Sequence, residues 1–124
     1  MKKYSVILCC YGLYDKEIRK REEMAGYDEY LFQVKEFILT NTNFIDSVIL
    51  SGGYTNKNKP DVSEAETVFQ YLKKMIPNIT FKIEDQSINT SQNVWEGLKK
   101  VRNEDAVVIC DNWRHWKVKA IAKS

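Results

Sequence analysis

The sequence is poor in several residues and patterns on which common protein functions depend. Its 124 residues include one histidine, two prolines and three cysteines, and its formal net charge is only +2. No apolar run approaches the roughly 18 residues that a membrane-spanning helix needs. A small net charge gives no strong attraction to nucleic acid or to an acidic membrane surface. We therefore expect neither a membrane nor a nucleic acid as a partner.

The three cysteines favour a structural role in a reducing compartment. Cys9, Cys10 and Cys110 all fall in predicted strands. Adjacent strand residues point to opposite faces, so Cys9 and Cys10 cannot act together as a metal pair of the C-x-x-C kind. An odd cysteine count and the lack of a secretory signal predict a cytoplasmic protein without a metal site, whose thiols serve as small apolar core residues.

Strand patterns and helix patterns alternate along the whole chain. Apolar runs predict buried strands at 4–10, at the segment ending in Leu50 and at 106–110, while 79–84 alternates apolar and polar residues like a sheet-edge strand. A fourth helix is predicted from Trp113 to the C-terminus. The three earlier helices have apolar stripes formed by Tyr27, Leu31, Val34 and Ile38, by Val62, Ala65, Val68, Phe69, Leu72 and Met75, and by Val94, Leu98 and Val101.

This βαβαβαβα order predicts one α/β domain over residues 1–124. Strands that alternate with helices through short loops are expected to be parallel and joined by right-handed crossovers. The edge character of the third strand favours the strand order 3-2-1-4. The predicted fold class is therefore three-layer and Rossmann-like, with a mainly parallel sheet and helices on both faces.

Polar residues or glycines follow the end of every predicted strand. Ligands of open α/β sheets bind beyond the carboxyl ends of the strands, so these residues form a predicted binding rim, with Arg21 close to it. Three helix starts follow the strand ends, and their free N–H groups suit an anion. The strand-end residues are Gly12, then Ser51, Gly52 and Gly53, then Glu84 and Ser87, and last Asp111, Arg114 and His115.

Part of this rim also has a purely structural explanation. The stretch 63–66 fits a capping box, in which the Ser63 and Glu66 side chains each bond the other's backbone amide. That leaves Glu64 unexplained. Gly52-Gly53 fits either a simple tight turn or a place where a ligand approaches the backbone.

The start of the third helix leaves a similar choice. Thr90 or Ser91 fits the capping position of that helix. Asn89 and Asn93 then have no structural role and remain candidates for binding a ligand.

Few residues qualify as catalysts. His115, the sole histidine, has an unperturbed pKa of about 6.5 that suits proton transfer, although a histidine between two tryptophans is more often part of a packed surface. Glu64 and Glu84 form an acid/base pair only if the fold brings them together. No Ser/His/Asp order, metal-ligand spacing or phosphate-cradling lysine loop is present.

Three motifs in the second half of the chain form a recognisable set. A strand ends in Ser51-Gly52-Gly53, a helix begins Ser63-Glu64-Ala65, and a Glu-x-x-Ser-x-Asn-Thr-x-x-Asn loop contains Glu84, Ser87, Asn89, Thr90 and Asn93. In order and spacing these motifs resemble those of the YdcF/SanA/ElyC-like family, a bacterial domain family of unknown function. The resemblance covers most of the chain from Val48 onward.

The resemblance implies a Rossmann-like domain whose motif residues, with Gly12, form the ligand rim. One cytoplasmic member of that family binds S-adenosylmethionine, whereas others are membrane-anchored and linked to the cell envelope, with no agreed reaction. Family members place Tyr-His and Arg-Ala after the fourth strand, where this chain has 113–116 as Trp-Arg-His-Trp and Lys119-Ala120. They usually add a further strand and helix, so the resemblance predicts a C-terminally short domain or a contribution from another chain.

Three functions are consistent with these observations. The first is a cytoplasmic binding domain for a nucleotide-like small molecule, with S-adenosylmethionine as the candidate cofactor. The second is an enzyme acting on a phosphorylated or sugar-linked envelope metabolite, with Glu64 as general base and Arg114 or His115 steadying anionic charge. The third is a non-catalytic interaction module, in which a face around Trp113 and Trp116 buries a partner and a second copy supplies a fifth strand in a homodimer. Sequence spacing does not decide whether any reaction is catalysed.

Overall fold

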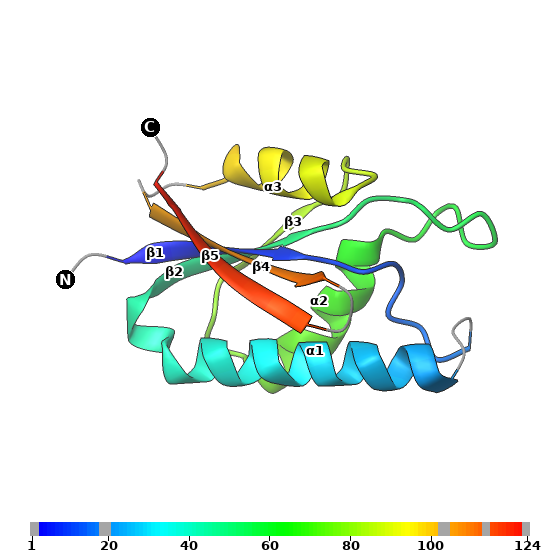
Figure 1. The fold of residues 1–124 in the computed structure, drawn as a ribbon, viewed down its shortest axis with the longest axis horizontal. Coiled ribbons are helices and arrows are strands. Elements are labelled where there is room, and N and C mark those ends of the chain that lie inside the picture. The colour runs from blue at the N-terminus through cyan, green and yellow to red at the C-terminus, as the bar shows by residue number, and fades with distance from the viewer. Residues whose placement is uncertain (1–2, 18–20, 102–104, 113–114, 123–124) are drawn as a thin grey trace.

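The computed structural model describes residues 3–17, 21–101, 105–112 and 115–122, with backbone alone for 21–23, 90–91, 111–112 and 115–122. Strands and helices alternate as far as the fourth strand, and a fifth strand follows it (Figure 1). The elements are β1 (Tyr4–Cys9), α1 (Arg21–Thr40), the short 3₁₀ helix η1 (Thr42–Phe44), β2 (Ile45–Ser51), α2 (Glu64–Met75), β3 (Phe81–Glu84), α3 (Thr90–Leu98), β4 (Asp105–Asn112) and β5 (His115–Ala122).

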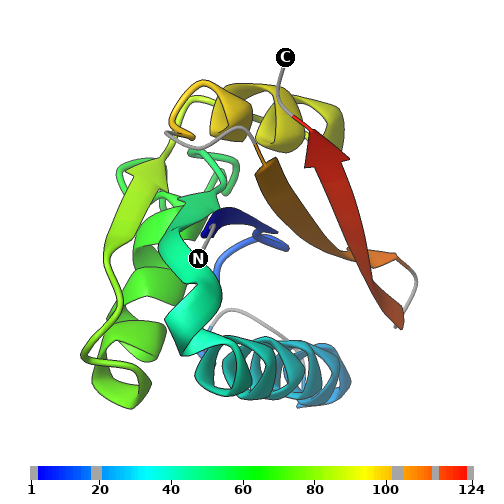
Figure 2. The ribbon, with the colours of Figure 1, turned by 90° about the vertical axis from the view of Figure 1, so that its left-hand side faces the viewer.

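The five strands form one sheet in the order β3-β2-β1-β4-β5. The first four are parallel, and β5 runs antiparallel to β4. Helices α1 and α2 cover one face and α3 covers the other, which gives three layers (Figure 2). The predicted Rossmann-like fold class and the order 3-2-1-4 are confirmed. The strand order reverses beside β1, where α/β sheets of this kind form their ligand crevices.

Alternate residues of β1 enter two separate cores. Val6 and Leu8 pack against α1 and α2, whereas Ile7 and Cys9 pack against the α3 side. A strand buried on both faces needs a continuous apolar run, and the run at the start of the chain supplies it. Cys10 belongs to the first core and Cys9 to the second, so the predicted opposite orientation of these two thiols is confirmed.

The predicted apolar stripe of α1 is fully buried, whereas that of α2 is buried only in part. Val62 precedes the helix, and Val62 and Phe69 are both half-buried. Ala65, Val68 and Leu72 are buried, but Met75 is 49 % exposed, so the prediction that Met75 faces the core is wrong. Met75 is the last residue of α2 and faces a hollow between α1 and α2. None of the helices in the described ranges is both long enough and apolar enough to cross a membrane.

The predicted C-terminal helix is wrong, because residues 115–122 form β5. Only two residues separate Asn112 from His115, a spacing that suits a hairpin between antiparallel strands. Lys117 and Lys119 alternate with Trp116, Val118 and Ala120, which is the two-residue period of a strand. The helix prediction followed the alternation of strands and helices along the chain instead of this local pattern.

The start of α2 is held by atoms of the chain itself. Ser63 is the N-cap, and its hydroxyl accepts a hydrogen bond from the Glu66 N–H at 3.1 Å. The N–H groups of the next two residues, Glu64 and Ala65, donate to the carbonyls of Gly53 and Gly52 at 2.9 and 3.1 Å. The glycine turn therefore ends β2 and also provides the acceptors from which α2 begins.

Replacing Ser63 by alanine is expected to lower the free energy of unfolding by about 1 kcal/mol, because the Glu66 N–H loses its acceptor. Urea unfolding followed by circular dichroism measures the change. Ser63→Thr keeps the hydroxyl and is expected to recover most of the loss. Equal stability of the alanine variant and the natural protein would contradict the capping role.

Candidate functional site

A cavity of about 280 Å³ lies at the carboxyl end of β1. Five residues of the predicted rim come together around it, although they lie far apart along the chain. Its lining consists of Cys10, Tyr11, Gly12, Glu64, Ser87, Ile88, Asn89 and Asn93. The prediction that polar strand ends converge at one edge is therefore confirmed for Gly12, Glu64, Ser87, Asn89 and Asn93, and their role in binding stays a prediction.

Glu64 is the charged group among the described lining residues, and it is only 7 % exposed. Its Oε1 accepts a hydrogen bond from the Gly12 N–H at 2.7 Å, and its Oε2 accepts one from the Thr55 hydroxyl. The position of Glu64 in the first turn of α2 adds a favourable interaction with the helix dipole. One carboxylate thus joins the loops after β1 and β2 to the start of α2.

The loop after β1 is fixed from the opposite side by Tyr27 of α1. The Tyr27 hydroxyl donates to the Gly12 carbonyl at 2.9 Å and accepts from the Tyr11 N–H at 3.0 Å. Gly12 has φ = 81°, a left-handed conformation that side chains disfavour. Glycine is therefore favoured at this position, whose N–H bonds Glu64 and whose carbonyl accepts from Tyr27.

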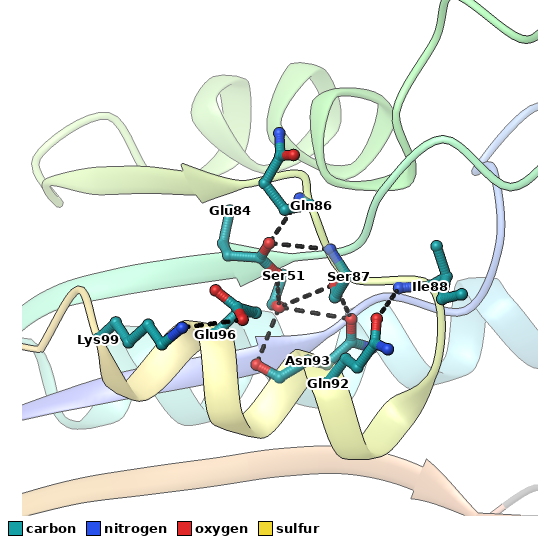
Figure 3. A network of polar contacts seen from close by, with 9 residues as sticks. All are labelled: Ser51, Glu84, Gln86, Ser87, Ile88, Gln92, Asn93, Glu96 and Lys99. Atoms are coloured by element: carbon teal, nitrogen blue, oxygen red, sulfur yellow. Dashed lines mark hydrogen bonds and ion pairs between the residues drawn. The ribbon is translucent and has the colours of Figure 1, made fainter.

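The other wall of the cavity rests on a buried polar network (Figure 3). Ser51 at the end of β2 donates to Glu84 Oε1 at 2.5 Å and lies 3.0 Å from the Asn93 carbonyl. Glu84 Oε2 accepts from the backbone N–H groups of Gln86 and Ser87 at 2.6 and 3.0 Å. The Ser87 hydroxyl in turn donates to Asn93 Oδ1. Four buried side chains therefore hold the β3–α3 loop against β2 and α3.

The two glycines after Ser51 are explained by close packing of the chain against itself. A Cβ on Gly53 would lie 2.2 Å from the Ser87 carbonyl oxygen, and one on Gly52 would lie 2.8 Å from the Cβ atoms of both Cys10 and Glu64. Glu64 thus packs closely against Gly52, and the β3–α3 loop packs closely against Gly53. Neither glycine lines the cavity.

Cys10 forms an uncharged part of the cavity wall. Burial raises the pKa of its thiol well above the ordinary value, and the nearby carboxylates of Glu64 and Glu84 raise it further. Both carboxylates are thus close enough to affect the same thiol. Hydrogen bonds hold them on different walls, with Glu64 on Gly12 and Glu84 behind Ser87.

The expected anion site at the start of α2 is wrong. Its first N–H groups already donate to Gly52, Gly53 and Ser63, so none of these three is free for a ligand. The capping box is half formed: Ser63 caps the helix as predicted, but Glu66 accepts from the Gln70 side chain at 2.6 Å.

The cap of α3 also differs from the prediction. Asn89 is the N-cap, and its Oδ1 accepts from the Gln92 N–H at 2.9 Å, so the predicted cap at Thr90 or Ser91 is wrong. Asn89 therefore has a structural role and also lines the cavity. A cap at Thr90 or Ser91 starts the helix later than Thr90, where the structure has its first residue, and so leaves Asn89 outside the helix start.

Five predicted site residues have undescribed side chains or lie outside the described residues. Arg114 lies outside the described ranges, as does Trp113 of the predicted interaction face. Arg21 and Thr90 begin α1 and α3, and Asp111 and His115 lie near the turn between β4 and β5, all four described by backbone alone. The β4 register places Asp111 at the same edge of the sheet as Cys10.

Sequence analysis missed four residues of this site. Cys10, Tyr11 and Ile88 line the cavity, and Thr55 bonds Glu64. Ile88 is 67 % exposed although it is apolar and lies in a polar loop, which is a pattern that the sequence does show. Nothing in the sequence distinguishes Thr55 from the rest of its loop.

A wider hollow of about 790 Å³ lies between the outer sides of α1 and α2. Tyr14 stacks on Tyr71 at its edge, with ring centroids 5.0 Å apart, and donates to the Asp28 carboxylate. The charged side chains that line this hollow are at the surface. The buried side chains of Glu64, Ser87 and Asn93 line the smaller cavity instead. We therefore take the smaller cavity as the candidate site.

Neither a metal-ligand cluster nor a similar known protein accounts for the site. Among the described residues, His, Cys, Asp and Glu side chains nowhere gather in a group of three or more that could hold a metal ion. Comparison of the chain with models of protein families, with curated proteins and with solved structures found no match. The family resemblance therefore stays a prediction, and the site must be interpreted from its own geometry.

Proposed function

We propose that the cavity beside β1 binds a nucleoside-like small molecule, with S-adenosylmethionine as the first candidate, in a cytoplasmic protein. The observation that carries the proposal is Glu64, a buried carboxylate that faces the cavity and is held on both oxygens. A carboxylate has about four acceptor positions, so Glu64 can also accept hydrogen bonds from a ligand. Ribose hydroxyls and ammonium groups are donors of this kind.

The charges around the cavity favour a cationic or hydroxyl-rich group over a phosphate. Glu64 is negative, Glu84 lies behind the same cavity, and the described lining contains no lysine or arginine. The N–H groups at the start of α2, which would suit a phosphate, are already bonded. A sulfonium or ammonium group therefore fits this environment better than a nucleotide phosphate.

The size of the cavity limits how much of the ligand it encloses. Small-molecule sites usually have volumes of about 300–1,000 Å³, and this cavity has about 280 Å³. It can enclose a sugar or a cationic side chain, and the rest of the ligand would extend over Tyr11 and Ile88 at the mouth. Tyr11 and Ile88 are both exposed and present apolar surface to a base.

Replacing Glu64 by glutamine is expected to weaken binding of S-adenosylmethionine about ten- to one-hundred-fold, the effect of losing a hydrogen bond to a charged group. Glutamine retains an oxygen for the Gly12 N–H and an amide that can donate to Thr55, so the fold should persist. Isothermal titration calorimetry of both proteins with S-adenosylmethionine, adenosine and ATP measures the affinities. We expect ATP to bind most weakly of the three.

Glu66→Gln is the matched control, because Glu66 lies in the same helical turn but does not line the cavity. It should leave the affinity unchanged. Absence of heat and of a melting shift with all three compounds would refute the proposed ligand class. If Glu64→Gln lowers the free energy of unfolding along with the affinity, the role of Glu64 is structural.

A further inference from the structure

Two of the three cysteines meet at the carboxyl end of the sheet. Cys9 ends β1, and Cys110 lies in β4 one position beyond Ile109, the residue that pairs with Leu8. Cys9 and Cys110 therefore lie opposite each other on neighbouring strands, and both side chains project from the face that α3 covers. The Cys110 thiol donates a hydrogen bond to Cys9 Sγ, with the two sulfurs 2.7 Å apart. Both thiols are free.

The backbone around this pair has a geometry compatible with a covalent bond. Neighbouring strands lie about 4.8 Å apart, and disulfides join Cα atoms separated by about 4.4–6.8 Å. An S–S bond is about 2.05 Å long, so the sulfurs need to approach by less than about 1 Å. On the α1 face, the buried Tyr30 hydroxyl shares its proton between the carbonyls of Cys9 and Ile109, which lie 2.8 and 3.1 Å away, and so links the ends of the two strands that carry the thiols.

We propose that Cys9 and Cys110 form a redox-active dithiol that hydrogen peroxide oxidises reversibly to an internal disulfide. The Cys110 thiolate attacks the peroxide, the O–O bond breaks, hydroxide leaves, and Cys110 becomes a sulfenic acid. The Cys9 sulfur then attacks the Cys110 sulfur, the S–S bond forms, and the S–O bond breaks. The leaving hydroxide takes the Cys9 proton as water, so two electrons pass from the sulfurs to the peroxide.

The environments of the two thiols assign these roles. Cys9 is 1 % exposed, whereas Cys110 is only partly buried and is the thiol that an oxidant can reach. When Cys110 loses its proton, the Cys9 thiol can donate to the thiolate. That hydrogen bond lowers the pKa of Cys110 and raises the pKa of Cys9. Cys110 is therefore the attacking thiol and Cys9 the resolving one.

The test treats the reduced 124-residue chain with hydrogen peroxide and follows its intact mass and reactive thiols. We expect the mass to fall by that of two hydrogen atoms and one of the three thiols, Cys10, to remain reactive after unfolding. Peptide mapping should find Cys9 joined to Cys110, and dithiothreitol should reverse the change. None of these measurements requires the ligand proposed above.

Three variants separate the roles of the thiols. Cys10→Ser is the matched control and should form the disulfide as the natural chain does, because Cys10 lies on the other face of the sheet. Cys9→Ser should stop at the sulfenic acid, which dimedone traps, and Cys110→Ser should resist oxidation. Retention of all three thiols, a bond to Cys10, or only disulfides between chains would overturn the proposal. Mapping of the natural chain alone decides the question if a variant fails to fold.

Discussion

Glu84→Ala is expected to lower the free energy of unfolding by about 3 kcal/mol, one of the two largest effects of a single substitution at this site. Glu84 is 2 % exposed and accepts three hydrogen bonds, from the Ser51 hydroxyl and from the N–H groups of Gln86 and Ser87. Alanine leaves both N–H groups without an acceptor and a cavity in place of the carboxylate. A buried donor such as the Ser87 N–H costs about 1–3 kcal/mol when it has no acceptor. The Gln86 N–H is part-buried and adds less.

Glu84→Gln distinguishes the loss of hydrogen bonds from the loss of charge. The glutamine oxygen can take the place of Oε2 and accept from Gln86 and Ser87, and its amide can donate to Ser51, whose hydroxyl then bonds the Asn93 carbonyl. We expect this variant to remain within about 1 kcal/mol of the natural protein. Urea unfolding measures both variants. Equal losses for alanine and glutamine would show that the charge, and not the network, stabilises the loop.

Gly53→Ala is expected to cost about 2–3 kcal/mol, because there is no room for a methyl group. The new Cβ would lie 2.2 Å from the Ser87 carbonyl oxygen and 2.7 Å from that of Asp85. Both are backbone atoms, so the β3–α3 loop would have to move as a whole. That movement would pull Ser87 away from Glu84, and we therefore expect the cavity to lose its wall along with the stability.

Gly26→Ala is the matched control for this substitution. Gly26 lies in the exposed side of α1, and a Cβ there would meet nothing within 4 Å. Alanine should raise the free energy of unfolding by about 0.5–1 kcal/mol, because glycine is a poor helix former. The two glycine substitutions thus have opposite expected signs in the same urea experiment. Similar values for both would mean that the β3–α3 loop does not pack on Gly53.

The sequence was sufficient to predict the layers, the order of four strands and the edge at which the site lies. The apolar run of β1 and the abrupt stop at Ser51-Gly52-Gly53 match the structure, as does the edge position of the third strand. The alternation predicted over 79–84 does not, because the strand begins at Phe81 and Glu84, on the predicted polar side, is buried. The mistake at β5 is of another kind. The two-residue period of 115–122 predicts a strand, whereas the chain-wide alternation of strands and helices predicts a helix, and the local period is the one that matches the structure.

The contacts of the candidate site could not be predicted in the same way. Glu64 bonds Gly12 across 52 residues and Ser51 bonds Asn93 across 42, and local patterns do not specify which distant groups meet. A capping box explained Ser63 but left Glu64 unassigned, because its partners, Gly12 and Thr55, come from two other loops. The sequence therefore predicts which residues are candidates for the site, whereas their hydrogen-bond partners are known only from the three-dimensional structure.

The anchoring of both cavity walls has a consequence for how a ligand would bind. Tyr27 ties the Gly12 side to α1, and Glu84 ties the Ser87 side to β2, so each wall is preorganised by side chains within the core. A preorganised receptacle avoids the entropy loss of ordering its loops around an incoming molecule. Association should then proceed almost as a rigid-body encounter, and differences in affinity between ligands should reside mainly in their dissociation rates.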